Sequence, residues 1–423
     1  MNEIKPTKSI GVPTPLVDGP EKVSGKAQYS ADFMPSDYLV GRIFRSPVSH
    51  AEIINVDISA AQALPGVKAV ITGDETDETF GILPVARFEH PLARDKVRYK
   101  GEPVACVAAV DVETAQKAVD LIKFKYKELP AYFTSQEAMA EGAVNIHDHR
   151  ERNIEREVDY DLGEVDEGFE AADLVMEETF NCAEVAQSQM EPHAAIAEYD
   201  PTRDFMTIHA STQVPYYGHL MLAKVLKMEE SQIRMIKPFV GGGFGCRTEC
   251  LNVELICALV ARAAGGTVRI VISREETFIT HRGRPETDVE MKIGLTKDGV
   301  ITAVDFKAIQ RGGAFSGYGI VTILYAGGMV FGLYDLPAVR YKGLRVLTNT
   351  PPCGAMRGHG VTNVRYAFES LLEKMANELS IDPIEIRRKN LLLGPKYETL
   401  NEMFINSYGL PECLDWVEKA SDW

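Results

Sequence analysis

Residues 241–245, which read Gly-Gly-Gly-Phe-Gly, constrain this chain more than any other stretch. A strand-like run precedes them, and an apolar pattern with helical spacing follows from about 251 to 264. Glycines let backbone N–H groups approach a ligand, and phosphate is an obvious candidate at a strand–loop–helix junction. However, a G-x-G-x-x-G motif from Gly241 would need glycine at Cys246, and a P-loop would need Gly-Lys-Ser/Thr there. A tight turn without any ligand explains the loop equally well.

The composition narrows the class of protein. A chain of 423 residues is too long for one ordinary core, so we expect two or three domains. Its 45% apolar and 25% charged residues are typical of a globular protein. We expect a cytoplasmic location without a membrane partner, because no apolar run approaches a membrane span and the N-terminus lacks a signal-peptide pattern. The net charge of −16 argues against nucleic acid as a partner.

Two features that are typical of metal sites have simpler explanations here. The seven cysteines form no C-x-x-C pair, so the sequence shows neither a structural zinc site nor an iron–sulfur site. His147, Asp148 and His149 are adjacent, and adjacent side chains on a strand point to opposite faces. We therefore interpret this charged region as an irregular, solvated linker.

The pattern of strands and helices predicts the α+β class in three parts. Residues 1–133 form an N-terminal α/β unit, residues 134–163 the linker, and residues 164–423 a larger α+β unit. In the larger unit, the clearest helical patterns are at 216–226, 251–264 and 364–379. Asp382 is expected to cap a further short helix that ends near Asn390.

Four stretches place an amide, a carboxylate or a guanidinium beside a flexible backbone. They are Met190–His193, Ser211–Pro215, the glycine loop, and the loop Thr350–Gly360. Each has a simpler explanation: Gln213 could satisfy a strand end, Arg357 could form a structural ion pair, and Glu191 and His193 could belong to a solvated loop.

Together and in this order, the stretches resemble the molybdenum hydroxylases, the family of xanthine dehydrogenase and aldehyde oxidase. The shared features are Gln213 of the Thr-Gln loop, Phe244 of Gly-Gly-Phe-Gly and Arg357 of the Arg-Gly-x-Gly loop. Further matches are Asp18-Gly…Lys22-Val-x-Gly25, Arg45-Ser-Pro47…His50-Ala, Tyr99-Lys-Gly-Glu-Pro103-Val and Arg387-Arg-x-Asn390-Leu. The resemblance covers almost the whole chain. It implies an N-terminal α/β hammerhead domain followed by the first part of a molybdopterin-binding α+β domain.

The resemblance also implies roles for residues of these loops. Gln213 would be the catalytic residue of this chain, hydrogen-bonding the apical oxygen of the molybdenum. Backbone N–H groups at Phe244 and Gly245, in the loop with Gly243, would hold the pterin and the metal together with Arg357 and Gly358. Gln213, Phe244 and Arg357 would surround the molybdenum. An amide donor, a bare backbone and a permanently charged arginine suit an anionic cofactor.

Three positions bear on the substrate. Where the purine-oxidising members of the family carry a Glu, an Arg and a stacking aromatic, this chain has Thr248, Tyr325 and His359. These exchanges disfavour purines and favour nicotinate, because a repelling carboxylate is lost and a tyrosine hydroxyl can donate to the substrate carboxylate. His359 could instead face the pterin or a neighbouring helix. The alternatives are an aldehyde, isoquinoline or purine substrate, or a non-catalytic nucleotide-binding or scaffold subunit.

The resemblance implies partners as well. The family's general-base glutamate lies in a Gly-Val-Gly-Glu motif, and nothing after Gly360 matches it. We therefore expect a second molybdopterin subunit that carries this glutamate, together with an FAD subunit and a [2Fe-2S] subunit. The expected cofactor is molybdenum on molybdopterin cytosine dinucleotide with a terminal sulfido or selenido ligand. In this respect the chain is most similar to the large molybdopterin subunits of nicotinate-oxidising members.

Overall fold

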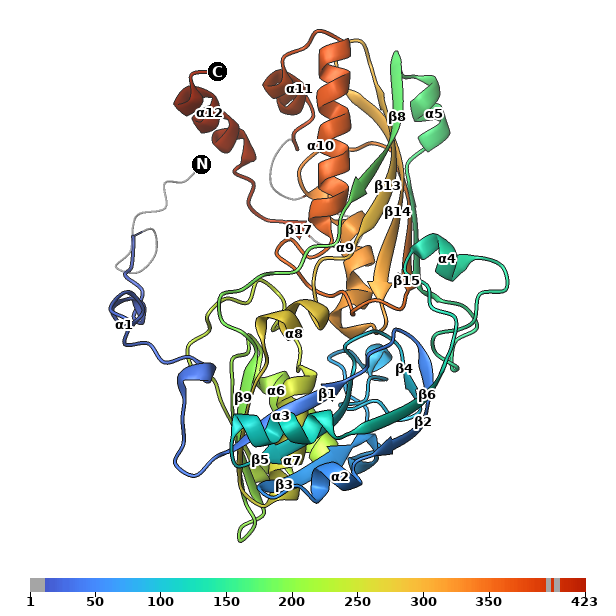
Figure 1. Ribbon diagram of the computed structural model, residues 1–423. Coiled ribbons are helices and arrows are strands. Elements are labelled where there is room, and N and C mark those ends of the chain that lie inside the picture. The colour runs from blue at the N-terminus through green and yellow to red at the C-terminus, as the bar shows by residue number, and fades with distance from the viewer. Residues whose placement is uncertain (1–11, 393–396, 399–403) are drawn as a thin grey trace.

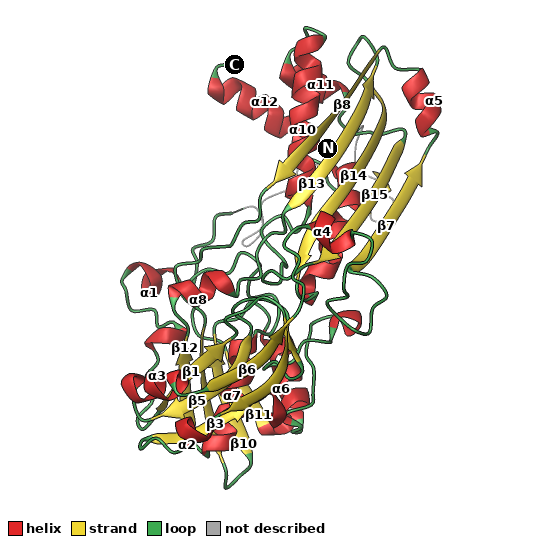
Figure 2. Cartoon of the chain, turned by 45° about the vertical axis from the view of Figure 1, so that its right-hand side comes forward, coloured by secondary structure: helices red, strands yellow, loops and turns green. Residues whose placement is uncertain are grey.

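The computed structural model describes residues 12–392, 397–398 and 404–423. The chain folds into two lobes joined by a layer of loops (Figures 1 and 2). One lobe is built on a seven-stranded sheet with a small three-stranded sheet beside it, and the other on a five-stranded sheet. Both lobes combine helices with mixed or antiparallel sheets, so the predicted α+β class is confirmed.

The seven-stranded sheet combines strands from the N-terminal third and the middle of the chain. Its order is β11 (Ile233–Ile236), β10 (Phe205–Ala210), β9 (Ala194–Asp200), β12 (Thr267–Val271), β1 (Leu39–Arg45), β5 (Pro103–Ala109) and β3 (Val67–Thr72). Strands β1 and β12 pair in parallel and join the two halves. The three-stranded sheet consists of β4 (Lys96–Val97), β2 (Ala51–Asp57) and β6 (Lys123–Glu128).

Strand β5 shows why this sheet is buried on both sides. All seven of its residues are buried, and most are small and apolar. Side chains alternate between the faces of a strand. Ala105, Val107 and Ala109 accordingly pack with helix α3 (Val112–Asp120), whereas Cys106 and Ala108 belong to the core around helix α7 (Asn252–Ala264). A strand covered on both faces needs such a continuous apolar sequence.

The five-stranded sheet has one covered and one charged face. Its order is β7 (Ile154–Leu162), β15 (Val339–Leu347), β14 (Ile301–Gly313), β13 (Thr287–Leu295) and β8 (Leu174–Cys182). Helices α9 (Thr322–Gly328) and α10 (Val361–Glu378) pack with it in one core. The buried positions of α10 follow helical spacing, with Val364, Phe368, Leu371 and Met375 on one side. As predicted, Asp382 caps α11 (Pro383–Lys389), its Oδ1 accepting from the Ile384 N–H at 2.8 Å.

The segment 134–163 was expected to be an irregular linker, but it contains regular elements. It contains α4 (Ser135–Met139) and the edge strand β7, which pairs antiparallel with β15. Its many charges concealed the strand pattern, because an edge strand exposes much of its surface. His147 is buried rather than solvated, and its Nε2 lies 2.7 Å from the carbonyl oxygen of Ala314.

The remaining elements are short or peripheral. They are α1 (Gly19–Val23), α2 (Ser59–Gln62), α5 (Val165–Glu170), α6 (Pro215–Leu226), α8 (Arg274–Ile279), α12 (Leu410–Ser421), β16 (Tyr397–Glu398), β17 (Phe404–Ile405) and 3₁₀ turns that include η5 (Gly317–Val321) and η6 (Val330–Gly332). Over the described residues, no helix is long and apolar enough to cross a membrane. Nor do three or more His, Cys, Asp or Glu side chains gather there in a way that could hold a metal ion.

Candidate functional site

The site-forming loops meet between the two lobes. Strands β10 and β11 are parallel neighbours, so the loops that leave their carboxyl ends emerge at the same edge of the sheet. The first loop carries Gln213 and the second is the glycine loop. The loop before α10, which carries Arg357, comes from the other lobe and joins them through a backbone hydrogen bond from the Arg357 N–H to the Phe244 carbonyl at 2.8 Å.

Gln213 is held in one orientation by the glycine loop. Its Oε1 accepts a hydrogen bond from the Gly245 N–H at 3.1 Å. Gly243 makes this approach possible, because a Cβ there would lie 2.5 Å from Oε1. The remaining polar group of the side chain is the Nε2 amide, which can only donate and has no acceptor among the described residues. Gln213 is exposed, so this donor is available to a group outside the chain.

The backbone of the glycine loop is strained at its tip. Phe244 has φ = 55°, a left-handed conformation that is uncommon for residues other than glycine, and its side chain is exposed. Gly245 has φ = 112°, and a Cβ there would lie 2.3 Å from the Ala355 carbonyl oxygen. Backbone strain of this kind persists where the surroundings enforce it, and it concentrates at functional sites.

A buried ion pair, which the sequence did not reveal, fixes the glycine loop from beneath. Glu191 Oε2 accepts from the Gly241 N–H and the Ser211 hydroxyl, each at 2.7 Å, and lies 3.0 Å from Arg247 Nη1. Arg247 also donates to the Ser211 carbonyl at 3.0 Å and to the Glu191 carbonyl at 2.8 Å. Glu191, His193 and Arg247 are all buried, so the solvated-loop interpretation of Glu191 and His193 is wrong.

Arg357 and Gly358 lie at the exposed tip of the loop before α10. The Arg357 carbonyl accepts from Arg284 Nη2 at 2.5 Å, whereas the Arg357 guanidinium has no hydrogen-bond or ion-pair partner in the described part of the chain. The structural ion pair that could have explained this arginine is therefore not formed within that part.

The structure brings together two of the three residues that were predicted to face the substrate. The ring of His359 packs edge-on against Tyr325, with centroids 5.2 Å apart, and against Tyr318 at 4.9 Å. Its Nε2 is buried and has no hydrogen-bond partner among the described residues. Burial, together with the charge of Arg345, lowers the pKa of His359 to about 4, so the ring is neutral near pH 7. Thr248 instead turns towards its own loop, donating to the Gly245 carbonyl at 2.7 Å.

Tyr318 and Glu249 are functional candidates that sequence reasoning missed. Tyr318 lies in the glycine-rich stretch 312–332, where no motif distinguishes it. Glu249 is buried beneath this stretch, since a Cβ at Gly317 would lie 2.5 Å from its Oε2, and burial raises its pKa. It therefore packs from inside against the turn that carries Tyr318 and does not face a substrate.

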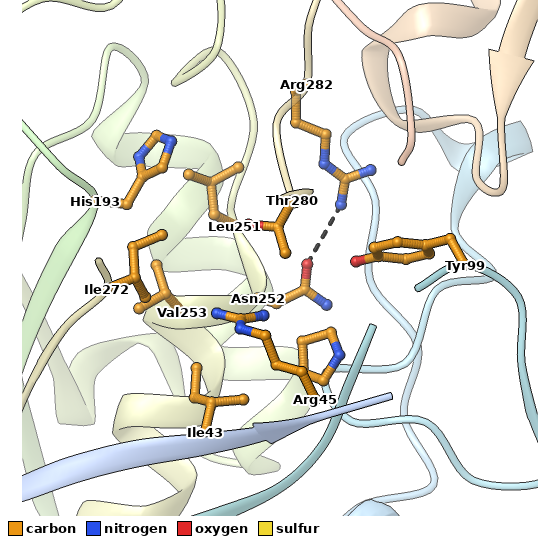
Figure 3. A pocket seen from close by; sticks show the side chains of 11 residues that line it. Ile43, Arg45, Tyr99, His193, Leu251, Asn252, Val253, Ile272, Thr280 and Arg282 are labelled. Carbon is orange, nitrogen blue, oxygen red and sulfur yellow. Dashed lines mark hydrogen bonds between the residues drawn. The ribbon is translucent and has the colours of Figure 1, made fainter. Parts of the chain in front are cut away.

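A separate cavity beneath the site is too small for an aromatic substrate. It measures about 30 Å³ and is lined by Arg45, Tyr99, His193, Asn252 and Arg282, among others (Figure 3). Arg282 Nη2 donates to the side-chain Oδ1 of Asn252 at 3.4 Å. Burial and the charge of Arg247 lower the pKa of His193 to about 3, which keeps this ring neutral. A cavity of this size holds no more than a few water molecules.

The residues at the tip fit an anionic, oxygen-rich group. Gln213 offers a fixed amide donor, Arg357 a free guanidinium, and the glycine loop a backbone without side-chain cover. In the described part of the chain, no carboxylate bonds Gln213 Nε2 or the Arg357 guanidinium, and Glu191 and Glu249 are both buried. This donor set suits a molybdopterin group, as the resemblance implied.

Two family descriptions match the chain. Residues 24–130 match the a/b hammerhead domain of aldehyde oxidase and xanthine dehydrogenase, and residues 146–391 match the molybdopterin cofactor-binding domain. The latter range contains the Gln213 loop, the glycine loop and the Arg357 loop. The predicted order of a hammerhead domain followed by a molybdopterin-binding domain is therefore confirmed.

Named relatives of the chain indicate the same family. The chain is 36% identical to the nicotinate dehydrogenase large molybdopterin subunit of Eubacterium barkeri, covering 96% of this chain and 94% of that one. It is 31% identical to a xanthine dehydrogenase molybdenum-binding subunit of Escherichia coli O157:H7, covering 96% of this chain but 55% of that one. Quinoline 2-oxidoreductase from Pseudomonas putida 86 superposes with a TM-score of 0.90 at 29% identity, covering 99% of this chain and 55% of that one.

The chain thus spans nearly all of the Eubacterium subunit and about half the length of the other two relatives. Their names include nicotinate, xanthine and quinoline, so they agree on the family and differ in the substrate. On the combined evidence of the loops, the fold and the relatives, this protein is a molybdenum-binding subunit of the xanthine dehydrogenase and aldehyde oxidase family of molybdenum hydroxylases.

Proposed function

We propose that the chain is the large molybdopterin subunit of a cytoplasmic enzyme that converts nicotinate to 6-hydroxynicotinate. The observation that carries the catalytic part is the fixed amide of Gln213, whose Oε1 is bound by the Gly245 N–H while its Nε2 stays free to donate. The substrate part is supported by the pair formed by Tyr325 and His359, and by the 36% identity with the Eubacterium subunit.

The proposed cofactor is molybdenum on molybdopterin cytosine dinucleotide with a terminal sulfido or selenido ligand. When bound, this group supplies both the activation of a water-derived oxygen and the acceptor for the substrate's electrons. Gln213 Nε2, the Phe244 N–H and the Arg357 guanidinium would hold it, and Gly243, Gly245 and Gly358 allow the close contacts within the chain that bring these loops together. The Gly245 N–H already donates to Gln213 Oε1, so Gly245 acts by orienting that side chain.

The chain's own residues would bind and orient the substrate. His359 is neutral, and its buried Nε2 has no hydrogen-bond partner among the described residues, so an N–H there can donate to a ring nitrogen or a carboxylate. The Tyr325 hydroxyl can donate to a carboxylate. Thr248, whose hydroxyl is engaged with Gly245, contributes chiefly by replacing a negative charge that would repel nicotinate.

Substrate selectivity tests this proposal. We expect the native complex to oxidise nicotinate in preference to nicotinamide and pyridine, and to leave xanthine untouched. Tyr325→Phe and His359→Phe should each narrow the preference for nicotinate over pyridine by roughly tenfold, since one hydrogen bond to a charged group contributes about 1.5–3 kcal/mol. Steady-state kinetics on the four compounds measures this.

Efficient xanthine turnover, or equal rates on nicotinate and pyridine, would refute nicotinate as the substrate. If both variants kept the native selectivity, these two side chains would have no part in it.

Further polypeptides would complete the enzyme. We propose a second molybdopterin subunit carrying the general-base glutamate, and FAD and [2Fe-2S] subunits that remove the electrons. The name of the Eubacterium relative, a large molybdopterin subunit, supports a divided molybdopterin unit. Exposed apolar side chains support a partner surface. The segment before α1 exposes Leu16 and Val17 at 74% and 98%, and α12 exposes Trp416 at 72%. Both segments project from the same side of the molecule (Figure 1).

Co-expression tests the divided unit. We expect the chain to purify with molybdenum only when the second molybdopterin polypeptide is present, because the apolar side chains on α12 and near α1 need cover. Size-exclusion chromatography with metal analysis of the chain alone and of the co-expressed complex measures this. A monomeric, stably folded and molybdenum-loaded single chain would contradict the proposal.

A further inference from the structure

A second buried ion pair lies behind the substrate-side residues. Arg345 on β15 and Glu155 on β7 have side chains without any solvent exposure, and Arg345 Nε lies 2.8 Å from Glu155 Oε2. Burying two charges is costly, and a buried ion pair is weak evidence for stability in itself. The other hydrogen bonds of Arg345 indicate what the pair does.

The guanidinium of Arg345 joins three segments of chain. Nη2 donates to the carbonyl of Gly312 at 3.0 Å and to the carbonyl of Cys353 at 2.6 Å. Nη1 lies 3.4 Å from the hydroxyl of Thr322. These groups belong to the end of β14, the loop that continues to Arg357, and the first residue of α9. A planar guanidinium carries fixed donors on three nitrogens and so reaches acceptors on several sides at once, whereas the three donors of a lysine ammonium sit on a single nitrogen.

The glycine-rich stretch 312–332 is shaped around this arginine. A Cβ at Gly319 would lie 2.2 Å from Arg345 Nη2 and 2.2 Å from the Cys353 carbonyl oxygen. The Thr322 hydroxyl is further held by the side-chain oxygen of Gln310 at 2.7 Å. Turn η5 and the start of α9 therefore pack directly against the guanidinium of Arg345.

These same segments carry the aromatic residues of the substrate side. Tyr318 lies on η5, Tyr325 on α9, and His359 on the same loop as Cys353. Their rings meet edge-on at 4.9 and 5.2 Å. Among the described residues, no hydrogen bond joins these three side chains to one another. They touch only through ring contacts, which occur over a range of centroid distances, so their spacing depends on the segments that carry them.

We propose that Arg345, paired with Glu155, is a positioning residue that sets the distance between His359 and the two tyrosines. It acts through Cys353 on one side and Thr322 on the other, and it touches neither substrate nor cofactor. This inference rests on the proposed function, because it gives the aromatic group Tyr318, Tyr325 and His359 the task of selecting the substrate.

The test is Arg345→Lys in the native complex. Lysine keeps the charge opposite Glu155 but loses the fork. We expect the KM for nicotinate to rise about tenfold with a smaller change in kcat, as for a loss of substrate binding. Amide hydrogen exchange should quicken in residues 317–328 and 353–360 while molybdenum content is unchanged. The exchange measurement needs no substrate, so it decides the inference even if nicotinate proves to be the wrong one.

Two controls separate positioning from general destabilisation. Arg340→Lys alters a paired arginine on the same strand that contacts Asp161 and Asp305 on the other face of the sheet. Val289→Ala removes buried volume from β13 away from these contacts. We expect both to leave the KM and the exchange of the two segments unchanged.

If Arg345→Lys fails to fold, Thr322→Val, which removes one acceptor, should give a smaller change in the same direction. The inference is overturned if neither variant changes the KM and local exchange more than Val289→Ala does.

Discussion

Replacing Gln213 by alanine should lower turnover by roughly 10²–10³-fold, the usual cost of losing one preorganised donor at a reacting centre. The Gly245 N–H fixes the amide of Gln213 so that its Nε2 can only donate outwards. Alanine keeps the backbone hydrogen bond from the residue 213 N–H to the Arg247 carbonyl, and so keeps the loop in place. Rapid-reaction kinetics with metal analysis of the same preparation measures the effect, and molybdenum content should match the wild type.

The matched control is Gln232→Ala, at a glutamine whose amide bonds Asp204 on the surface. It should leave turnover unchanged. Wild-type turnover by Gln213→Ala with a full complement of molybdenum would remove Gln213 from the chemistry. Loss of molybdenum in that variant would instead show that Gln213 acts chiefly by retaining the cofactor, and would contradict the direct effect on the chemical step that we propose.

Replacing Glu191 by alanine should be the most destabilising change near the site. Glu191 accepts hydrogen bonds from Ser30, Ser211 and Gly241, and it pairs with the fully buried Arg247. Removing it leaves a buried guanidinium without its countercharge, which typically costs about 3–5 kcal/mol. We expect a lower denaturant midpoint in equilibrium unfolding, and loss of molybdenum because the Gly241 N–H is no longer held.

The comparison is Glu178→Ala, which removes a carboxylate that pairs with Lys374 on the surface. Exposed ion pairs contribute about 0–1 kcal/mol, so this variant should unfold close to the wild type and retain molybdenum. Equal stability of the two variants would show that the Glu191–Arg247 pair does not support the glycine loop.

Local patterns predicted much of the fold. Helix α10 and the Asp382 cap of α11 follow from apolar spacing and a capping residue, both of which are local in sequence. The α+β class follows from the same signals. Strand β7 was missed because it lies at the edge of its sheet, where charged side chains face solvent and weaken the apolar alternation.

The supports of the site could not be predicted in the same way. Glu191 and Arg247 lie 56 residues apart, and Glu155 and Arg345 lie 190 apart. No periodic pattern connects such pairs, and only the folded chain brings them together. The loops themselves were found through the family resemblance, because glycine and arginine motifs of this kind are local. Tyr318 had no such signal, since its role depends on its packing against His359.

Metal and pterin analysis of the native complex tests the central claim most directly. The glycine loop, Gln213 and Arg357 are assigned to a molybdopterin group on the strength of their free donors and open backbone. Elemental analysis should find molybdenum in equal amount to this chain, and acid treatment should release a pterin and a cytosine nucleotide. A complex that oxidises its substrate without molybdenum, or that contains no pterin when purified intact and active, would contradict the account.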